Sequence, residues 1–397
     1  MIKSFRYRIY PTPKQERKLL TTLTTCRYLY NNALSERIKE YKENKKYVSY
    51  FQQANNLKEN KNKYQKKVHS QVLQETLRRL DKSFSNFFRR IKNGESKVGF
   101  PRFKSDNRYN SFCYPQSGFG ISKDGKRIKL SKIGEIKLKY SREVENIKTC
   151  RVTRNVDQWF VVLTSEVEKK QETNYNDKEV GIDVGISNYL TLSNGETVDN
   201  PRILKSFEKK LSREQRKLSK KQKGSNNKKK QKLKVIRVHR KIKNVRNDFL
   251  HKLSTNLVKD YGKIVFEDLN IKGMLKNHKL AKHINDCSWH TLIEMTRYKA
   301  EEAGCEFVLV NAKNTSQICS NCGSIEKKTL SDRVHKCSVC GLEMDRDHNA
   351  AINILSRAGT ARINASGDIV RPNLNSQNLN LAVSLNEESP PNQALAR

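Results

Sequence analysis

Three acidic side chains stand where their chemistry could be combined. Asp183 lies inside the apolar run 180–186 between two glycines, which predicts a buried strand that carries one carboxylate. Alone, it would more often be a hydrogen-bonded core residue. However, Glu267 ends a second apolar run, and Asp347 lies at the start of a predicted helix. Three carboxylates on separate elements can hold two divalent cations that activate water and stabilise the leaving oxygen of a phosphodiester. Hydrolysis of nucleic acid is therefore the first hypothesis.

Four cysteines form the most specific motif in the chain. Cys319 and Cys322 are separated by two residues, as are Cys337 and Cys340, and fourteen residues lie between the two pairs. This is the spacing of a four-cysteine zinc ribbon, and the glycine after each pair fits a tight turn. Because four thiolates complete the coordination of Zn²⁺, the predicted zinc is structural and not catalytic.

The other candidate ligands near or outside this motif are given different roles. His335 and His348 are predicted to be surface residues or nucleic-acid contacts instead of zinc ligands. The remaining cysteines are predicted to be buried free thiols; they are Cys26, Cys113, Cys150, Cys287 and Cys305.

The charge of the chain indicates its partner. Lys and Arg total 80 against 41 Asp and Glu, which gives a net charge of +39. Such a protein repels itself unless a polyanion neutralises it, and nucleic acid is the obvious polyanion. Membrane binding is disfavoured because only 35% of the residues are hydrophobic and no apolar run is long enough to span a bilayer. Without a signal peptide at the start of the sequence, we expect a cytoplasmic protein with reduced cysteines.

The first part of the chain is predicted to combine a small sheet with helices. Residues 2–10 alternate as a strand, and Thr12, Pro13 and Gln15 then form a capping box that starts a helix. Short alternating runs between 111 and 164 predict an antiparallel sheet or barrel. Two apolar stripes at helical spacing predict buried faces: Leu19, Leu23, Cys26, Tyr30 and Ala33, and then Leu73, Leu77, Leu80, Phe84 and Phe87.

The second part follows the order strands, helix, strand, helix, strand, helix, which is typical of a ribonuclease-H-like core. Asn194-Gly195 predicts a hairpin turn, and residues 203–260 predict a long basic helical hairpin whose tip is the charged tract 220–234. A helix at 289–303 and a strand at 306–310 precede the cysteine motif. The expected buried stripe of the hairpin is Ile242, Val245, Phe249, Leu253 and Leu257.

Five segments, in chain order, resemble the TnpB family of transposon-encoded nucleases, which are related to the compact type V CRISPR effectors. They read Gly-Phe-Pro-Arg-Phe-Lys at 99–104, Gly-Ile-Asp-Val-Gly-Ile at 181–186, Phe-Glu-Asp-Leu-Asn at 266–270, Thr-Ser-Gln-Ile-Cys-Ser-Asn-Cys-Gly at 315–323 and Asp-Arg-Asp-His-Asn-Ala-Ala at 345–351. The resemblance extends from the N-terminus to about residue 355 and is specific because the motifs occur together and in order.

The resemblance implies a RuvC-type catalytic site and a set of nucleic-acid contacts. The catalytic carboxylates, holding two Mg²⁺ ions, would be Asp183, Glu267 and Asp347, with Asp268 and Asp345 as neighbours. A guide RNA from the transposon end would select double-stranded target DNA by base pairing, next to a short target-adjacent motif, and the protein would act as a monomer on its RNA. It suggests Arg333, Lys336 and Arg346 as phosphate contacts. Independently of the resemblance, Arg102 and Lys104 alternate with aromatic residues, a combination that suits base stacking and phosphate contact, so they are expected to contact nucleic acid as well.

The predicted fold class is multidomain α+β. A wedge-like β-barrel is expected at 1–10 and 105–168, with an inserted helical recognition domain at 11–104. The ribonuclease-H-like (RuvC) core is expected at 178–314 and 345–357, interrupted by the 203–260 hairpin and by a zinc ribbon at 315–344. Residues 169–177 are a predicted linker, and the Asn-, Ser- and Pro-rich segment 358–397 is a predicted disordered tail.

Two other functions are compatible with the same residues. A nuclease-inactive, RNA-guided DNA-binding repressor would share the architecture, although the presence of all three carboxylates argues against it. A transposase protein acting in strand transfer could also use three carboxylates. The cysteine motif between the last core strand and the third carboxylate, together with the basic hairpin, favours the guided nuclease.

Overall fold

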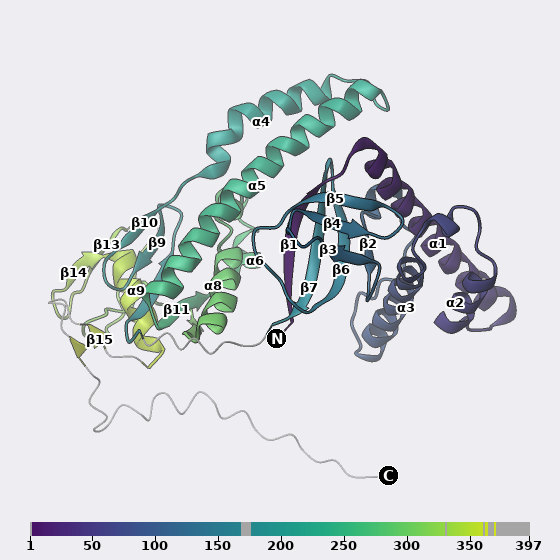
Figure 1. Ribbon diagram of the computed structural model, residues 1–397. Coiled ribbons are helices and arrows are strands. Elements are labelled where there is room, and N and C mark those ends of the chain that lie inside the picture. Colours follow the sequence, from purple (N-terminus) through teal and green to yellow (C-terminus); the bar gives the residue numbers. More distant parts are fainter. Residues whose placement is uncertain (1, 168–175, 330–331, 360–361, 364–368, 371–397) are drawn as a thin grey trace, which may run out of the picture. The chain divides into compact units, whose positions relative to one another are not determined.

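The computed structural model describes residues 2–167, 176–329, 332–359, 362–363 and 369–370, and the chain divides into two compact units, Met1–Lys169 and Lys170–Arg397. The predicted linker at 169–177 and the predicted tail at 358–397 lie for the most part outside the described residues. Each unit has its own core, so each is described by itself. Figure 1 shows the helices and strands of the chain.

The first unit contains a seven-stranded antiparallel sheet. In chain order its strands are β1 (Ile2–Tyr10), β2 (Ser111–Tyr114), β3 (Phe119–Ile121), β4 (Arg127–Leu130), β5 (Gly134–Lys139), β6 (Ile147–Asn155) and β7 (Gln158–Glu166). They are arranged β2-β6-β7-β1-β5-β4-β3, so the N-terminal strand lies inside the sheet, between β7 and β5. The hydrogen-bonded order does not join the edge strands β2 and β3, and a closed barrel therefore stays a prediction.

Three helices pack with this sheet in one core: α1 (Pro13–Asn44), α2 (Tyr50–Glu59) and α3 (Ser70–Lys92). Single 3₁₀ turns occur at Gln65–Lys67 and Asp106–Arg108. The capping box predicted at the start of α1 is confirmed, because the Thr12 hydroxyl accepts from the Gln15 amide and the Gln15 side chain accepts from the Thr12 amide. The predicted stripe of α1 is fully buried, and in α3 only Phe87 is less than fully buried.

The second unit is built on a mixed five-stranded sheet. Its strands are β8 (Glu179–Val184), β9 (Asn188–Leu192), β10 (Thr197–Asp199), β11 (Lys263–Asp268) and β12 (Glu306–Asn311), in the order β10-β9-β8-β11-β12. The first three strands pair antiparallel, whereas β8, β11 and β12 are parallel. The predicted Asn-Gly hairpin is confirmed between β9 and β10, where Gly195 has φ +88°.

The two faces of this sheet carry different layers. Alternate residues of β8 and β11, such as Ile182 and Phe266, share a core with side chains of α5 (Asn226–Asp260) and α8 (Trp289–Ala303). On the other face, Val265 packs with the last turns of α9 (Arg346–Arg357). Gly181 allows this helix to lie against β8, because a Cβ at Gly181 would stand 2.2 Å from the backbone oxygen of Ala351.

The predicted basic hairpin is formed by α4 (Ile203–Ser219) and α5, which run side by side (Figure 1). Its tip is shorter than the predicted 220–234, because α5 begins at Asn226 after the Ser225 cap. The charged tract is therefore largely helical, and within it the buried Gln231 amide donates to the Glu214 carboxylate of α4 at 2.7 Å.

For one residue of the predicted stripe in α5, the prediction of burial is wrong. Val245 is 39% exposed. It lies between the part of α5 that packs in the hairpin, through Val238 and Ile242, and the part that packs in the sheet core, through Leu250. Helical periodicity cannot show that the packing partner of a helix changes along its length.

The remaining described elements are short. They are α6 (Ile271–Met274), α7 (Ala281–Cys287), β13 (Val334–Lys336), β14 (Glu343–Asp345), β15 (Arg362–Ile363) and β16 (Ile369–Val370). The five cysteines outside the motif are buried free thiols, as predicted. Across the described residues we find no helix with both the length and the hydropathy that a bilayer span requires.

Candidate active site and metal centre

Two of the three candidate carboxylates lie on neighbouring parallel strands. The register of β8 and β11 pairs Ile182 with Phe266, so Asp183 and Glu267 occupy the next position on each strand. Because side chains at paired positions of parallel strands point to the same face, both carboxylates face the side of the sheet covered by α9. Both also lie near the carboxyl ends of their strands.

The third carboxylate is brought to this face by the start of α9. Asp345 caps the helix, since its Oδ1 accepts from the amides of Asp347 (2.9 Å) and His348 (3.0 Å). The helix then passes over Gly181. As a result Asp347, in the first turn, is close enough to Asp183 for its negative charge to perturb that carboxyl.

The electrostatics of the cluster are those of crowded negative charges. Burial, together with the charges of Glu267 and Asp347, raises the pKa of Asp183 to about 8, against an opposing effect of Arg346. Burial also raises the pKa of Glu267, while the hydrogen bond from the Thr315 hydroxyl acts in the opposite direction. A divalent cation would relieve this repulsion, and carboxylate oxygens are the donors that Mg²⁺ prefers.

The ligand atoms of the three carboxylates lie farther apart than those of the four cysteines. Within the described residues, only the four motif cysteines form a group of His, Cys, Asp or Glu with all ligand atoms within 4.8 Å of one another. Asp347 is held by Arg346, whose Nη2 and Nε donate to Oδ1 at 2.9 and 3.1 Å. Arg346, which was predicted to contact nucleic acid, is here the ion-pair partner of a candidate metal ligand, and its role toward nucleic acid stays a prediction.

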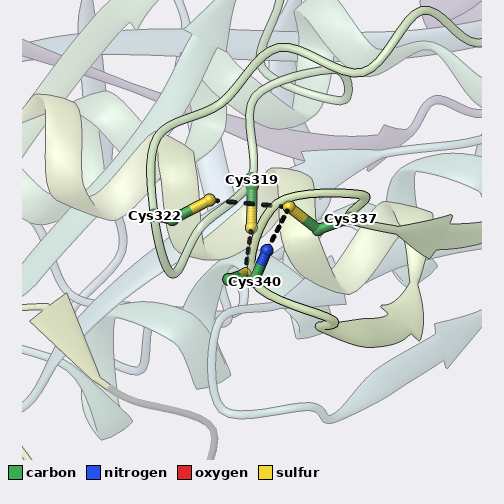
Figure 2. A group of neighbouring side chains, drawn as sticks. All are labelled: Cys319, Cys322, Cys337 and Cys340. Atoms are coloured by element: carbon green, nitrogen blue, oxygen red, sulfur yellow. Dashed lines mark hydrogen bonds between the residues drawn. The ribbon is translucent and has the colours of Figure 1, made fainter.

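The four cysteines predicted to bind zinc converge on one point (Figure 2). The sulfur atoms of Cys319 and Cys340 are 3.6 Å apart, and those of Cys322 and Cys337 are 3.5 Å apart. Four thiolates around zinc at about 2.3 Å would lie about 3.8 Å from one another, so the cluster fits this ion.

Each cysteine pair is followed by a glycine with positive φ, as the tight turns require: +79° at Gly323 and +73° at Gly341. The hydroxyl of Ser324 and the amide of Cys340 lower the pKa of Cys337 to about 6, which favours the thiolate that a metal binds. In contrast, burial raises the pKa of Cys319 to about 12.

The prediction that His335 is a surface residue is wrong. Its side chain, in β13, is fully buried, with Lys328, Glu326 and the backbone of Ser316 close enough to influence its pKa. The compact fold around the cysteines encloses this position, which spacing along the chain cannot reveal. His348 is half-buried, and its Nε2 lies 3.1 Å from the carbonyl oxygen of Ser193.

The other basic residues predicted to contact nucleic acid are placed as follows. Arg102 and Arg333 are exposed, and Lys336 forms an ion pair with Glu343 at 2.9 Å. Lys104 is half-buried, with its ammonium 5.7 Å from the centre of the Tyr30 ring. Their binding to nucleic acid stays a prediction.

Three polar residues for which the sequence predicted no individual role contact the site or the loop beside it. Thr315 donates to the Glu267 carboxylate, and Asn349 and Asn353 of α9 bind the backbone of the loop that contains Thr315. The available signal was the pair of asparagines four positions apart on the apolar face of a helix, because such residues are rarely buried without partners.

Three family models match different parts of the chain. A model described as "Probable transposase" matches residues 162–278, a "Cas12f1-like, TNB domain" model matches 289–354, and a "Helix-turn-helix domain" model matches 1–46. In the last range the structure has β1 followed by the single continuous helix α1.

Full-length relatives decide the family. A "Putative RNA-guided DNA endonuclease" from Streptomyces pristinaespiralis is 38% identical over 382 residues, covering 93% of this chain and 92% of its own. This chain belongs to the TnpB family. Another relative, the "Putative RNA-guided DNA endonuclease InsQ" of Escherichia coli, is 32% identical over 391 residues and covers 93% and 95% of the two chains. A "TnpB-like protein L79" of Acanthamoeba polyphaga mimivirus is 29% identical over 210 residues, covering 49% of this chain and 40% of its own.

Proposed function

We propose that this TnpB-family chain is an RNA-guided DNA endonuclease encoded by a transposable element. It cleaves double-stranded DNA next to a short target-adjacent motif, through a two-metal site formed by Asp183, Glu267 and Asp347. The observation that carries the proposal is that β8, β11 and α9 bring these three carboxylates to one face of the sheet. The names of the full-length relatives support the same activity.

The second unit is proposed to be a ribonuclease-H-like (RuvC) core with an inserted zinc ribbon. Its strand order, three antiparallel strands followed by two parallel ones, supports this assignment. The zinc ribbon is supported by the convergence of the four cysteines. Zn²⁺ there would be structural, because its coordination would be complete.

The residues of the site have distinct tasks in this mechanism. Asp183, Glu267 and Asp347 would hold two Mg²⁺ ions, which, when bound, lower the pKa of the attacking water and neutralise the leaving oxygen. Arg346 holds Asp347 through Oδ1 and also donates to the Asp332 carbonyl, which fixes the orientation of the carboxylate. The buried Glu267 is held by Thr315.

The rest of the chain would bind the nucleic acids. A guide RNA would pair with the target strand, while the protein recognises the backbone and shape of the heteroduplex. The first unit, as wedge and helical recognition domains, and the α4–α5 hairpin supply basic surface for this contact, in keeping with the net charge of +39. The working complex would be a monomer on its RNA in the cytoplasm.

A transposase acting in strand transfer is the second candidate, because the family model matching residues 162–278 is described as a probable transposase. It would need the same carboxylates but no guide RNA. The two activities therefore differ in whether a discrete RNA accompanies the protein.

The deciding experiment is to purify the protein with its native locus, sequence the RNA that accompanies it, and supply DNA that matches this RNA. Magnesium should be omitted rather than chelated, because a strong chelator would also remove zinc from the cysteines. We expect cleavage at the matched site only with Mg²⁺. Asp183→Ala should abolish cleavage but keep RNA and DNA binding, since this carboxylate would hold metal and not phosphate. A bound RNA without cleavage would favour the repressor, and no discrete RNA would favour the transposase.

A further inference from the structure

The candidate carboxylate on β11 has one hydroxyl partner. The Oγ1 of Thr315 donates a hydrogen bond to Oε1 of Glu267 and lies farther, at 3.3 Å, from the carbonyl oxygen of Ala312. Thr315 and Glu267 are only 5% and 8% exposed. Thr315 lies in the loop after β12, the strand whose Val310 pairs with Glu267. A buried carboxylate with a fixed donor is restricted in its rotamers, so the position of this loop determines where the Glu267 oxygens point.

The loop itself is clamped by α9. The side-chain amide of Asn353 donates to the carbonyl oxygens of Thr315 (2.9 Å) and Ile318 (2.7 Å). One turn earlier, Asn349 donates to the Ile318 carbonyl at 2.7 Å and accepts from the amide of Ser320 at 2.9 Å. The two asparagines are 7% and 0% exposed, so few alternative partners from solvent are open to them.

This clamp connects two parts of the site that are distant in sequence. Asn349 and Asn353 belong to the helix that begins with Asp347. The loop they hold carries Thr315 at one end and continues into Cys319 at the other. A displacement of the helix or of the cysteine motif would therefore move the hydroxyl that holds Glu267.

We propose that Thr315 is a positioning residue for Glu267, kept in place by the Asn349–Asn353 clamp, and that it sets the affinity of the carboxylate site for divalent cations. The inference rests on the proposed function, because it takes Glu267 as a metal ligand. Replacing a partner that orients a ligating carboxylate typically lowers metal affinity about 10- to 100-fold. We expect a loss of this size in Thr315→Val, which keeps the shape of threonine but removes the donor.

The test is Mn²⁺ binding to the RNA-free protein, followed by electron paramagnetic resonance, with the signal of Asp183→Ala subtracted as background. RNA must be absent because it binds Mn²⁺ itself. Thr315→Ser, which retains the hydroxyl, should bind within about threefold of wild type. In cleavage assays, Thr315→Val should need a higher Mg²⁺ concentration for half-maximal rate while the KM for DNA stays unchanged. If Thr315 only supported the fold, its replacement would not raise the Mg²⁺ requirement while leaving the KM for DNA unchanged.

Asn353→Ala gives a second arm that touches no carboxylate. Like Thr315→Val, it should weaken Mn²⁺ binding. If Thr315→Val does not fold, Asn353→Ala and Thr315→Ser together still test the proposal. The matched control is Asn200→Ala, since Asn200 also binds a backbone carbonyl in this unit, that of Ile186 at 2.8 Å, but does not contact the loop. Zinc content and, in a Trp159→Phe background, the fluorescence of the buried Trp289 report whether the second unit of each variant is folded.

Wild-type Mn²⁺ affinity in folded Thr315→Val and Asn353→Ala would overturn the positioning role. Failure of the proposed function has a different signature. The wild-type protein would then bind Mn²⁺ through Asp183 and cut no guide-matched DNA, while a weaker Mn²⁺ affinity of Thr315→Val would still support the positioning role.

Discussion

Replacing Asp183 by Asn should stabilise the metal-free protein. Burial and the charges of Glu267 and Asp347 raise the pKa of Asp183 from 3.8 to about 8. Between these values the folded chain binds this proton and the unfolded chain has released it, so the stability of the wild type falls as pH rises. The free energy of unfolding falls by about 1.4 kcal/mol for each unit of pH above 3.8, so at pH 7 the undiscounted loss from Asp183 would be about 4 kcal/mol. Because the side chain is partly exposed, we expect a gain of about 1–3 kcal/mol for Asp183→Asn.

The two tryptophans of the chain permit a direct measurement. Trp159 belongs to the core of the first unit and Trp289 to that of the second. In a Trp159→Phe background, urea unfolding followed by fluorescence therefore reports the unit that contains Asp183. The free energies of unfolding with and without the Asp183→Asn substitution should be compared in Mg²⁺-free buffer at several pH values between about 4 and 8.

The difference between the two proteins should be small near pH 4 and grow toward pH 8, and Mg²⁺ should stabilise only the protein that retains Asp183. Asp268→Asn is the matched control, because Asp268 is an exposed carboxylate at the end of the same strand as Glu267; its effect should stay within about 0.5 kcal/mol. The reasoning is refuted if Asp183→Asn is no more stable than the protein with Asp183 at pH 7, or if its advantage does not increase with pH.

Three further outcomes are expected. Gly181→Ala should lower the stability of the second unit by about 1–3 kcal/mol and strongly reduce cleavage, because the new Cβ would meet the backbone of α9 and displace Asp347. Urea unfolding and cleavage rates test this expectation. The control is Gly120→Ala, since no atom lies within 4 Å of a Cβ at that position. Cys337→Ser should release zinc and destabilise the same unit, measured by metal content and unfolding; a soluble variant with full zinc content and activity would contradict it. Binding to non-matching DNA should weaken about 10³-fold or more between about 50 and 200 mM salt, and a flat salt dependence would exclude extensive phosphate contacts.

Local signals in the sequence predicted individual elements well. The capping box at Thr12, the Asn-Gly turn at Gly195 and the helix Trp289–Ala303 depend on interactions between residues close in the chain, and all three were confirmed. The cysteine spacing likewise identified a group that converges in space. The errors at Val245 and His335 arose where burial depends on which distant surface packs against an element.

The sequence by itself determined which residue types were available: three carboxylates on separate elements, four cysteines at metal-binding spacing, and a net charge of +39. Only the tertiary structure decided how they meet. The pairing of Ile182 with Phe266 aligns Asp183 with Glu267, and the close approach of α9 to Gly181 brings Asp347 to the same face. The hydroxyl of Thr315 reaches Glu267 because buried polar groups must find partners once the strands have paired. Such contacts depend on register and backbone approach between segments far apart in the chain, which no local pattern encodes.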